Sequence, residues 1–362
     1  MTAARPVGHP RDMRPAVARG PAVAGVELSA GVIHVVLGRR EDSLLRVTAK
    51  GEAVLPDGAI NGGLVADRAV TAEALRVAFA QAEHAQRAER VTVAIDSDDM
   101  RTFHALTSFE REDSRSAVAP GEESRAMREA ASEASRRAAA ATEEDAALRG
   151  VATARLHDDV AALALDGRGL RSLVGHRGRV VEVWTDVTMA SLVVSGAVTA
   201  TLEATRRRGA LISGAYALGR LLAASGVLDG GVIKLGSDAT SLAVVRDGRV
   251  VGTRVFGLGR QALLARGSRA ADDAKVWADC VVASLRGLDG TPPGRWIFVG
   301  VPESLLALPE TLADAVRGIR GEDVDIAPLA VSLATRVIGD GLRSDDLTAA
   351  GAAAIAAGIY DS

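Results

Sequence analysis

The sequence is poor in cysteine, in long apolar runs and in grouped histidines, and each shortage excludes a kind of protein. A single cysteine, Cys280, in 362 residues excludes an internal disulfide framework and a cysteine-rich metal site, and it favours a reducing compartment. No apolar run approaches the roughly 20 residues that a membrane-spanning helix needs, so we expect no integral membrane protein. The six histidines are scattered, with none three to five residues from another, which excludes a local histidine pattern for a metal.

Lysine is scarce and the net charge is small. The chain has 43 basic and 46 acidic residues, a net charge of −3, and only three lysines, Lys50, Lys234 and Lys275. This balance gives no electrostatic footprint for nucleic acid, so we expect no nucleic-acid partner. The excess of arginine is typical of a high-GC genome and carries little functional information. Hydrophobic residues make up 48% of the chain, which is ample for a core, although aromatic residues make up only 3%.

The first 20 residues differ from the rest. They contain four arginines and three prolines and no apolar segment, which excludes a signal peptide. We interpret residues 1–20 as a disordered basic tail, with a weak contact to an anionic surface as the functional alternative.

The remaining sequence repeats one pattern of elements. Residues 22–37 predict two strands around a turn, followed by a strand at 44–54, a helix at about 71–87 and a strand at 91–95. The same order of elements returns later in the chain. This repetition predicts a duplicated α/β domain pair with a cleft between the two copies. The second copy comprises a strand–turn–strand at 231–245, a strand at 250–256, a helix at 270–285 and a strand at 295–300.

A segment of different composition separates the two copies. Residues 109–148 are rich in arginine, glutamate and alanine, and they predict an exposed helix from 122 to about 141. Strands are expected at 160–165 and 180–184. The apolar residues 352–360 predict a buried helix near the C-terminus.

Glu27-Leu-Ser-Ala30 stands at the turn of the first predicted hairpin, and Lys234-Leu-Gly-Ser-Asp-Ala-Thr240 stands at the turn of the second. Together with the stretches 58–67 and 165–183 and with Ala271-Asp-Asp-Ala-Lys275, these motifs, in this order, resemble the actin/Hsp70/sugar-kinase superfamily and, within it, the bacterial FtsA and PilM group. That superfamily has Asp-Ile-Gly-Thr in its first phosphate-gripping hairpin and Asp-Ile-Gly-Gly-x-Thr-Thr in its second. The stretches 58–67 and 165–183 are similar to FtsA motifs, and residues 271–275 are similar to its Ala-Glu-x-x-Lys helix.

The resemblance implies a fold and a domain organisation. The fold is an α/β, actin-like (ribonuclease-H-like) duplicated two-lobe fold with an FtsA-type inserted subdomain. Residues 21–90 and 335–362 would form lobe 1, residues 91–190 the inserted subdomain, and residues 191–334 lobe 2.

The resemblance also implies a nucleotide site, from which this sequence departs. In the superfamily two hairpin aspartates hold the Mg²⁺ shell and the attacking water, whereas here Glu27 is longer by one methylene and Lys234 is a cation. Asp238 would add negative charge near the phosphates. We therefore expect ATP and Mg²⁺ to bind poorly, with Glu27 as the only catalytic candidate and Glu27 and Asp238 as the possible metal ligands. The candidate nucleotide-binding residues are Glu27, Ser29, Ala30, Gly31, Lys234, Gly236, Ser237, Asp238, Thr240, Gly257, Gly259, Lys275 and Gly300.

Several functions remain open. The first hypothesis is a non-enzymatic, FtsA-like scaffold of cell division or envelope assembly, with the inserted subdomain as its contact module. The second is an ATP-binding, polymerising actin-like ATPase with a remodelled site. The third is a PilM-like component of a type IV pilus or secretion platform. Expected partners are an FtsZ-like protein or the cytoplasmic peptide of a membrane protein, with self-association also open. We expect a cytoplasmic location, reaching the membrane only through a partner.

Overall fold

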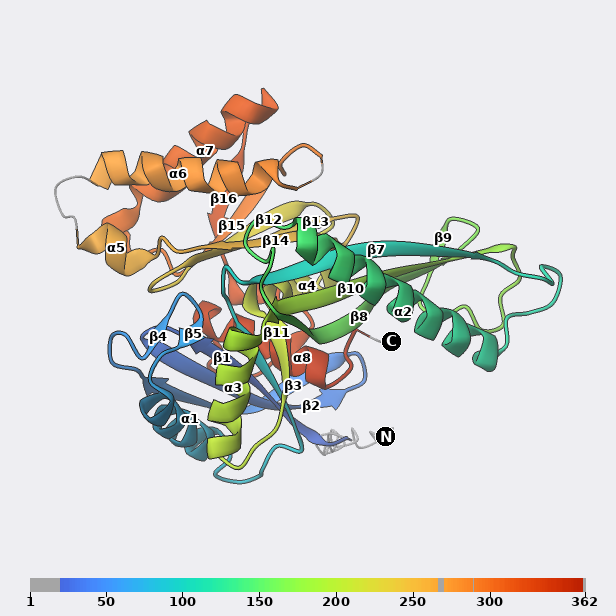
Figure 1. Ribbon diagram of the computed structural model, residues 1–362, viewed down its shortest axis with the longest axis horizontal. Helices are drawn as coiled ribbons and strands as arrows, with labels where there is room; N and C mark the ends of the chain where they lie inside the picture. The colour runs from blue at the N-terminus through green and yellow to red at the C-terminus, as the bar shows by residue number, and fades with distance from the viewer. Residues whose placement is uncertain (1–19, 266–269, 289, 361–362) are drawn as a thin grey trace, which may run out of the picture.

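The computed structural model describes residues 20–265, 270–288 and 290–360. The predicted basic tail therefore lies outside the described residues, apart from Gly20. Figure 1 shows two lobes stacked on one another, and an elongated arm that projects from the junction between them.

A mixed six-stranded sheet forms the centre of lobe 1. Its strand order is β11-β6-β1-β2-β3-β17, with β1 antiparallel to β2 and parallel to β6. Strand β1 is buried from Ala22 to Leu28, as its mainly apolar sequence predicts for a central strand, and the buried run includes Glu27. The strands are β1 (Ala22–Ser29), β2 (Val32–Glu41), β3 (Leu44–Val54), β6 (Arg90–Ile95), β11 (Ala210–Ser213) and β17 (Val337–Ile338), and a separate small hairpin comprises β4 (Ile60–Asn61) and β5 (Leu64–Val65).

Helices cover both faces of this sheet. Alternate β1 residues, such as Val26 and Leu28, pack with helices α1 (Arg68–Ala82) and α3 (Leu192–Ala204). The intervening residues, such as Val23, face helix α8 (Leu347–Ala356). The helix expected at 71–87 begins earlier, because the side chain of Asp67 accepts a hydrogen bond from Val70 N and caps the helix there, and it also ends earlier, at Ala82.

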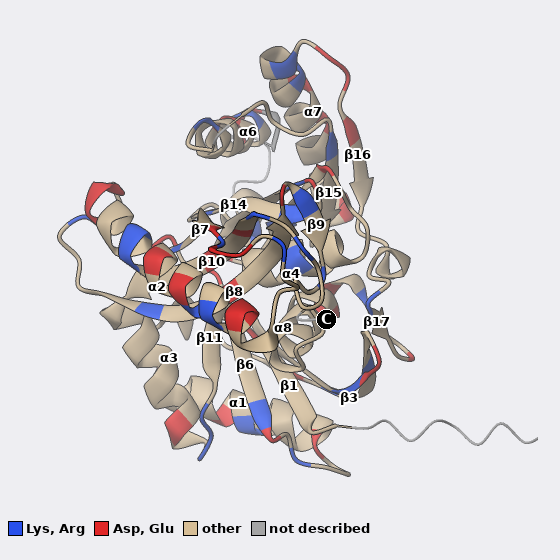
Figure 2. Cartoon of the chain, turned by 90° about the vertical axis from the view of Figure 1, so that its right-hand side faces the viewer, with Lys and Arg blue, Asp and Glu red and all other residues tan. Residues whose placement is uncertain are grey.

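The arm comprises most of the range 91–190 that was expected to form an inserted subdomain, but β6 in that range belongs to the lobe 1 sheet because it pairs with β1. Its antiparallel sheet has the order β7-β10-β8-β9, and helix α2 (Pro120–Glu144) packs on one face through Ala130, Ala134 and Ala138. These small side chains let the helix lie close to the sheet. In Figure 2 its outer surface carries charges of both signs, as the composition of residues 109–148 predicts. The strands are β7 (Met100–Glu110), β8 (Thr153–Leu165), β9 (Arg168–Leu170) and β10 (Val180–Ser191).

Lobe 2 repeats the plan of lobe 1. Its sheet has the order β14-β13-β12-β15-β16, with β12 antiparallel to β13 and parallel to β15. Trp277 and Trp296 are fully buried in its core, as expected for large aromatic residues, whereas Trp184 in the arm is only partly buried under Arg249. The elements are β12 (Gly230–Leu235), β13 (Thr240–Arg246), β14 (Arg249–Phe256), β15 (Arg295–Val299), β16 (Asp325–Pro328), α4 (Gly214–Ala224), α5 (Arg260–Leu264), α6 (Ala270–Arg286) and α7 (Ala307–Arg320).

The two lobes meet where α4 crosses α8. A Cβ on Gly351 would lie 2.5 Å from the carbonyl oxygen of Ala217, so only glycine permits this approach. The range 191–334, expected in lobe 2, does not lie wholly there. Helix α3 packs with α1, and β11 pairs with β6 in the lobe 1 sheet, because the chain completes that sheet after leaving the arm.

No helix within residues 20–265, 270–288 and 290–360 combines the length and the apolar character needed to cross a bilayer.

Candidate functional site

Two β-hairpins, one from each lobe, face one another across the cleft. The first consists of β1 and β2, the second of β12 and β13, and each is the first hairpin of its sheet. The turn of the first hairpin lies close to the second hairpin: a Cβ atom added to Gly31 would lie 3.5 Å from Ser237 Oγ. The space between them is about 30 Å³, enough for one or two water molecules. Its lining includes Glu27, Ser29, Ala30, Gly63, Asp96, Gly214, Lys234, Gly236, Asp238 and Ser241.

Lys234 and Glu27 meet at the floor of this cleft. The Lys234 amine contacts Glu27 Oε1 and lies 3.3 Å from the Thr348 hydroxyl on α8. The side chains of Lys234 and Glu27 are only 14% and 5% exposed. Burial lowers the pKa of Lys234 to about 7, since a desolvated ammonium is costly. Glu27 Oε2 is buried and has no hydrogen-bond partner among the described residues. The amine therefore supplies the main compensation for burying this carboxylate.

The carboxylate of the second hairpin is also engaged. Asp238 Oδ2 accepts a hydrogen bond of 2.6 Å from the backbone N–H of Gly62, in the turn between β4 and β5 of lobe 1. Ser29 in the first hairpin donates to the carbonyl of Val32 and so closes its own turn. The polar groups at the two hairpin tips are thus bound to the protein itself.

Asp96 lines the cleft, although it is not among the nucleotide-binding residues predicted from the sequence. It follows the buried strand β6 and accepts a 2.8 Å hydrogen bond from Ala215 N at the start of α4, and it also hydrogen-bonds Ser241. Burial raises the pKa of Asp96, although these hydrogen bonds oppose the shift. An aspartate directly after a buried, mainly apolar strand was the signal available in the sequence.

The other candidates lie outside the cleft lining. Thr240 is buried and donates to the carbonyl of Leu258 while it accepts from Trp277, so it holds the lobe 2 core. Gly259 supports the second hairpin from behind, since a Cβ there would lie 2.4 Å from the carbonyl carbon of Asp238. Gly300 packs against the end of β12, and Lys275 is exposed on α6. Gly257 has open space around its Cα.

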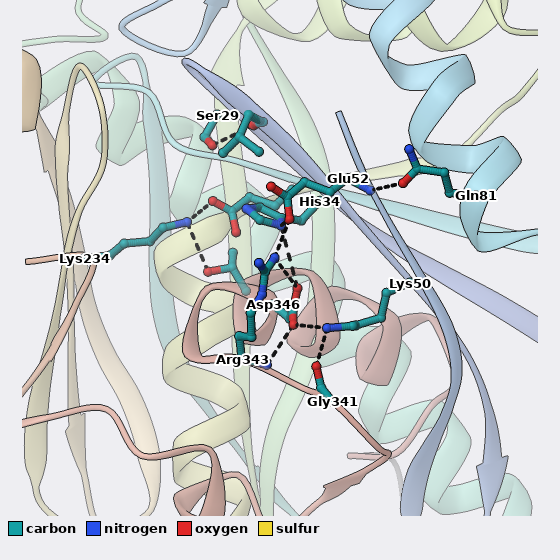
Figure 3. A network of polar contacts seen from close by, with 12 residues as sticks. Ser29, His34, Lys50, Glu52, Gln81, Lys234, Gly341, Arg343 and Asp346 are labelled. Carbon is teal, nitrogen blue, oxygen red and sulfur yellow. Dashed lines mark hydrogen bonds and ion pairs between the residues drawn. The ribbon is translucent and has the colours of Figure 1, made fainter. Parts of the chain in front are cut away.

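A network of charged groups lies beside the cleft in lobe 1 (Figure 3). Lys50 donates to Asp346 Oδ2 at 2.7 Å, and Arg343 pairs with Glu52. His34 lies buried among them, 3.7 Å from Asp346 Oδ1, and burial lowers its pKa despite the nearby carboxylates. This network anchors the segment before α8 to strands β2 and β3.

The cleft floor in this arrangement presents an amine–carboxylate contact in place of a free set of oxygen ligands. Mg²⁺ prefers hard oxygen ligands, whereas an amine contacts the Glu27 carboxylate here. Within the described part of the chain, no three His, Cys, Asp or Glu side chains converge as a metal site. Small-molecule sites usually enclose about 300–1,000 Å³, about ten times the space between these hairpins or more.

A second hollow, of about 490 Å³, lies at the edge of the lobe 1 sheet beside the arm. Arg90 and Arg208 are exposed at its rim, His157 of β8 comes from the arm, and Ile355 and Ala356 supply apolar surface. Its lining thus combines basic and apolar groups from two structural units.

Buried polar groups join the arm to α4. The hydroxyl of Tyr216 lies 2.8 Å from both Asp159 Oδ2 and Asp186 Oδ2, and Arg220 donates to Asp159 at 2.9 Å. His104 lies 2.7 Å from Asp186 Oδ1. Burial disfavours ionisation of Asp159, but the adjacent Arg220 holds its pKa below the ordinary value. Burial raises the pKa of Tyr216 well above its usual range. These contacts fix the orientation of the arm on lobe 2.

Comparison with solved structures identifies the fold, although no protein-family model and no curated protein matches the sequence. A structure described as the "PilM-PilN type IV pilus biogenesis complex" superposes with a TM-score of 0.54 at 17% identity, covering 93% of this chain and 97% of that one. EutJ from Carboxydothermus hydrogenoformans gives a TM-score of 0.41 at 17% identity, covering 89% and 90% of the two chains. The ROK hexokinase from Thermus thermophilus gives 0.40 at 16%, covering 92% and 97%. The chain has an actin-like fold, which confirms the expected fold class.

Proposed function

We propose that this chain is an actin-like adaptor that works through protein contacts rather than through ATP turnover. The observation that supports this most is the Lys234–Glu27 contact at the floor of the cleft. An amine at this position offers no oxygen ligand to a divalent cation and engages the carboxylate that would otherwise bind it. The small volume between the hairpins supports the same proposal.

The setting we propose is an assembly at the inner face of the bacterial membrane. The similar PilM structure is a complex with PilN of type IV pilus biogenesis, and its likeness covers nearly the whole of both chains. A PilM-like role in a pilus or secretion platform therefore now leads, and an FtsA-like role in cell division is the alternative. In either role the chain would be cytoplasmic and would reach the membrane through its partner.

The hollow beside the arm is the partner surface that we propose. Arg90 and Arg208 offer exposed positive charge, and Ile355 offers apolar contact beside them. A partner segment that carries acidic and apolar side chains would complement this lining. Because β8 and the lobe 1 sheet both contribute, such a segment would contact the arm and the lobe together.

Phosphate release from Mg-ATP tests the absence of turnover. We expect the purified full chain to release phosphate no faster than buffer, and Glu27→Gln to leave that rate unchanged. Turnover that requires Mg²⁺ and disappears in Glu27→Gln would overturn the proposal and favour a polymerising ATPase with a remodelled site. Addition of the partner should not induce turnover.

A further inference from the structure

Three sets of side-chain contacts bridge the two lobes around the cleft. We propose that they form a latch by which the protein holds its own lobes closed, so that closure needs no ligand between the hairpins. The latch consists of Glu27, Asp57 and Gly62 on lobe 1 and Lys234, Asp238 and Gln261 on lobe 2. The inference rests on the proposed function only in taking the cleft to be free of nucleotide.

The innermost contact lies at the cleft floor. Lys234 projects from β12 of lobe 2 and meets Glu27 of β1 and Thr348 of α8, both in lobe 1. Opening the cleft would separate the amine from Glu27 and leave a largely buried carboxylate without its partner. A buried charge that loses its partner is strongly destabilised, so this contact resists opening.

The second contact lies above it, at the hairpin tip. Asp238 accepts a hydrogen bond from Gly62 N, which belongs to the turn between β4 and β5. The charge of the carboxylate strengthens this hydrogen bond. Gly62 has φ +57° and Gly63 has φ +79°. Both values suit glycine, and the turn they form presents the Gly62 N–H to Asp238.

The outer contact lies at the rim. Gln261 Nε2 on α5 donates to Asp57 Oδ1 of lobe 1 at 2.8 Å. The start of α5 is itself held to the second hairpin, because Arg260 N donates to the carbonyl of Gly236 and Gln261 N to that of Ser237. Gln261 is therefore attached to the hairpin that carries Asp238, so we expect the rim contact and the tip contact to break together when the cleft opens.

The three contacts run from floor to rim, so no rotation that opens the cleft preserves them all. A ligand bound between the hairpins would have to bridge the two lobes at these positions. In this chain the protein's own side chains bridge them. The closed arrangement is therefore the form of the protein to which partners bind.

A distance measurement across the cleft tests the latch. Spin labels are placed at Glu73→Cys on α1 and Glu310→Cys on α7, both exposed and in different lobes, in a Cys280→Ser background. Double electron–electron resonance then gives the distribution of distances in the full chain. We expect a narrow distribution that Mg-ATP leaves unchanged at about 5 mM, a concentration above typical KM values.

Two latch variants should open the cleft. Asp238→Ala/Gln261→Ala removes the tip and rim contacts at positions that are not buried, and Glu27→Leu/Lys234→Met removes the floor pair without leaving an unpaired charge. Each should shift the distribution to longer distances and widen it. Glu83→Leu/Arg207→Met is the matched control, because it removes a similarly buried ion pair that lies within lobe 1, and it should leave the distribution unchanged.

A distribution in the variants identical to that of the unsubstituted chain would overturn the latch. So would an unsubstituted chain that is broadly distributed and narrows only with Mg-ATP. The first result leaves the proposed adaptor function intact, whereas ATP turnover would overturn that function without any change in the resting distances. The two proposals therefore fail on different readouts.

Discussion

The backbone N–H of Gly62 donates a 2.6 Å hydrogen bond to Asp238 Oδ2, and it joins a turn of lobe 1 to the β12–β13 hairpin of lobe 2. Asp238→Ala should therefore lower the free energy of unfolding by about 1.5–3 kcal/mol, the usual effect of losing a hydrogen bond to a charged group. Chemical denaturation measures it. Asp323→Ala, at a fully exposed aspartate, is the control and should change stability by less than about 0.5 kcal/mol. Equal effects of the two substitutions would refute the assignment.

The Lys234 amine should make stability depend on pH. Its pKa is 10.5 in an unfolded chain and about 7 in the folded protein. Between these values the unfolded state binds one more proton, so the free energy of unfolding should rise with pH by up to about 1.4 kcal/mol per unit. Denaturant titrations at several pH values from 7 to 10 measure the slope. Lys234→Met should remove this contribution, and the exposed Lys275→Met should retain it. A wild-type slope that Lys234→Met leaves unaltered would show that Lys234 stays charged.

Tyr216 should matter more to stability than Tyr360. The Tyr216 hydroxyl lies between Asp159 and Asp186 at the junction of the arm with α4. Tyr216→Phe removes the one O–H donor that lies between the two buried carboxylates and should cost about 1.5–3 kcal/mol. The Tyr360 hydroxyl is buried with no hydrogen-bond partner in the described part of the chain, so Tyr360→Phe should be neutral or stabilising. Thermal unfolding of the two variants compares them, and the reverse order would contradict the junction described above.

The hollow beside the arm should carry partner binding. Arg90→Glu/Arg208→Glu reverses the exposed charge at its rim and should abolish binding of the partner that the unsubstituted chain captures. Arg317→Glu, on α7 of lobe 2, is the control and should bind normally. Quantitative co-purification followed by titration with the captured partner measures the effect. Unimpaired binding by the double variant would place the partner surface elsewhere.

Much of the fold follows from local patterns. The repeated strand–turn–strand order predicted two similar lobes because each hairpin is coded by adjacent residues, as in β1 and β2 or β12 and β13. The arm helix α2 followed from its composition. The return of β11 to the lobe 1 sheet was not predicted, because a four-residue strand joined by parallel pairing to β6 leaves little local signal.

The site was predictable only in part. Glu27, Ser29, Ala30, Lys234, Gly236 and Asp238 do line the cleft, since hairpin motifs fix where such residues lie. The partners of these residues come from distant segments. No sequence motif marks Gly62, Asp57 or Gln261. Their contacts form only where the two lobes come together, which the sequence does not show. The scarcity of lysine, with three in 362 residues, drew attention to Lys234 in the sequence. The contact between Lys234 and Glu27 depends on the tertiary structure and could not be predicted.

Calorimetric titration of ATP into the purified protein, first with Mg²⁺ and then with EDTA, tests the central claim most directly. The account predicts no heat of binding in either buffer, because the Lys234 amine contacts the Glu27 carboxylate and the hairpins leave almost no space between them. Binding that requires Mg²⁺ would contradict it and would make the cleft a nucleotide site.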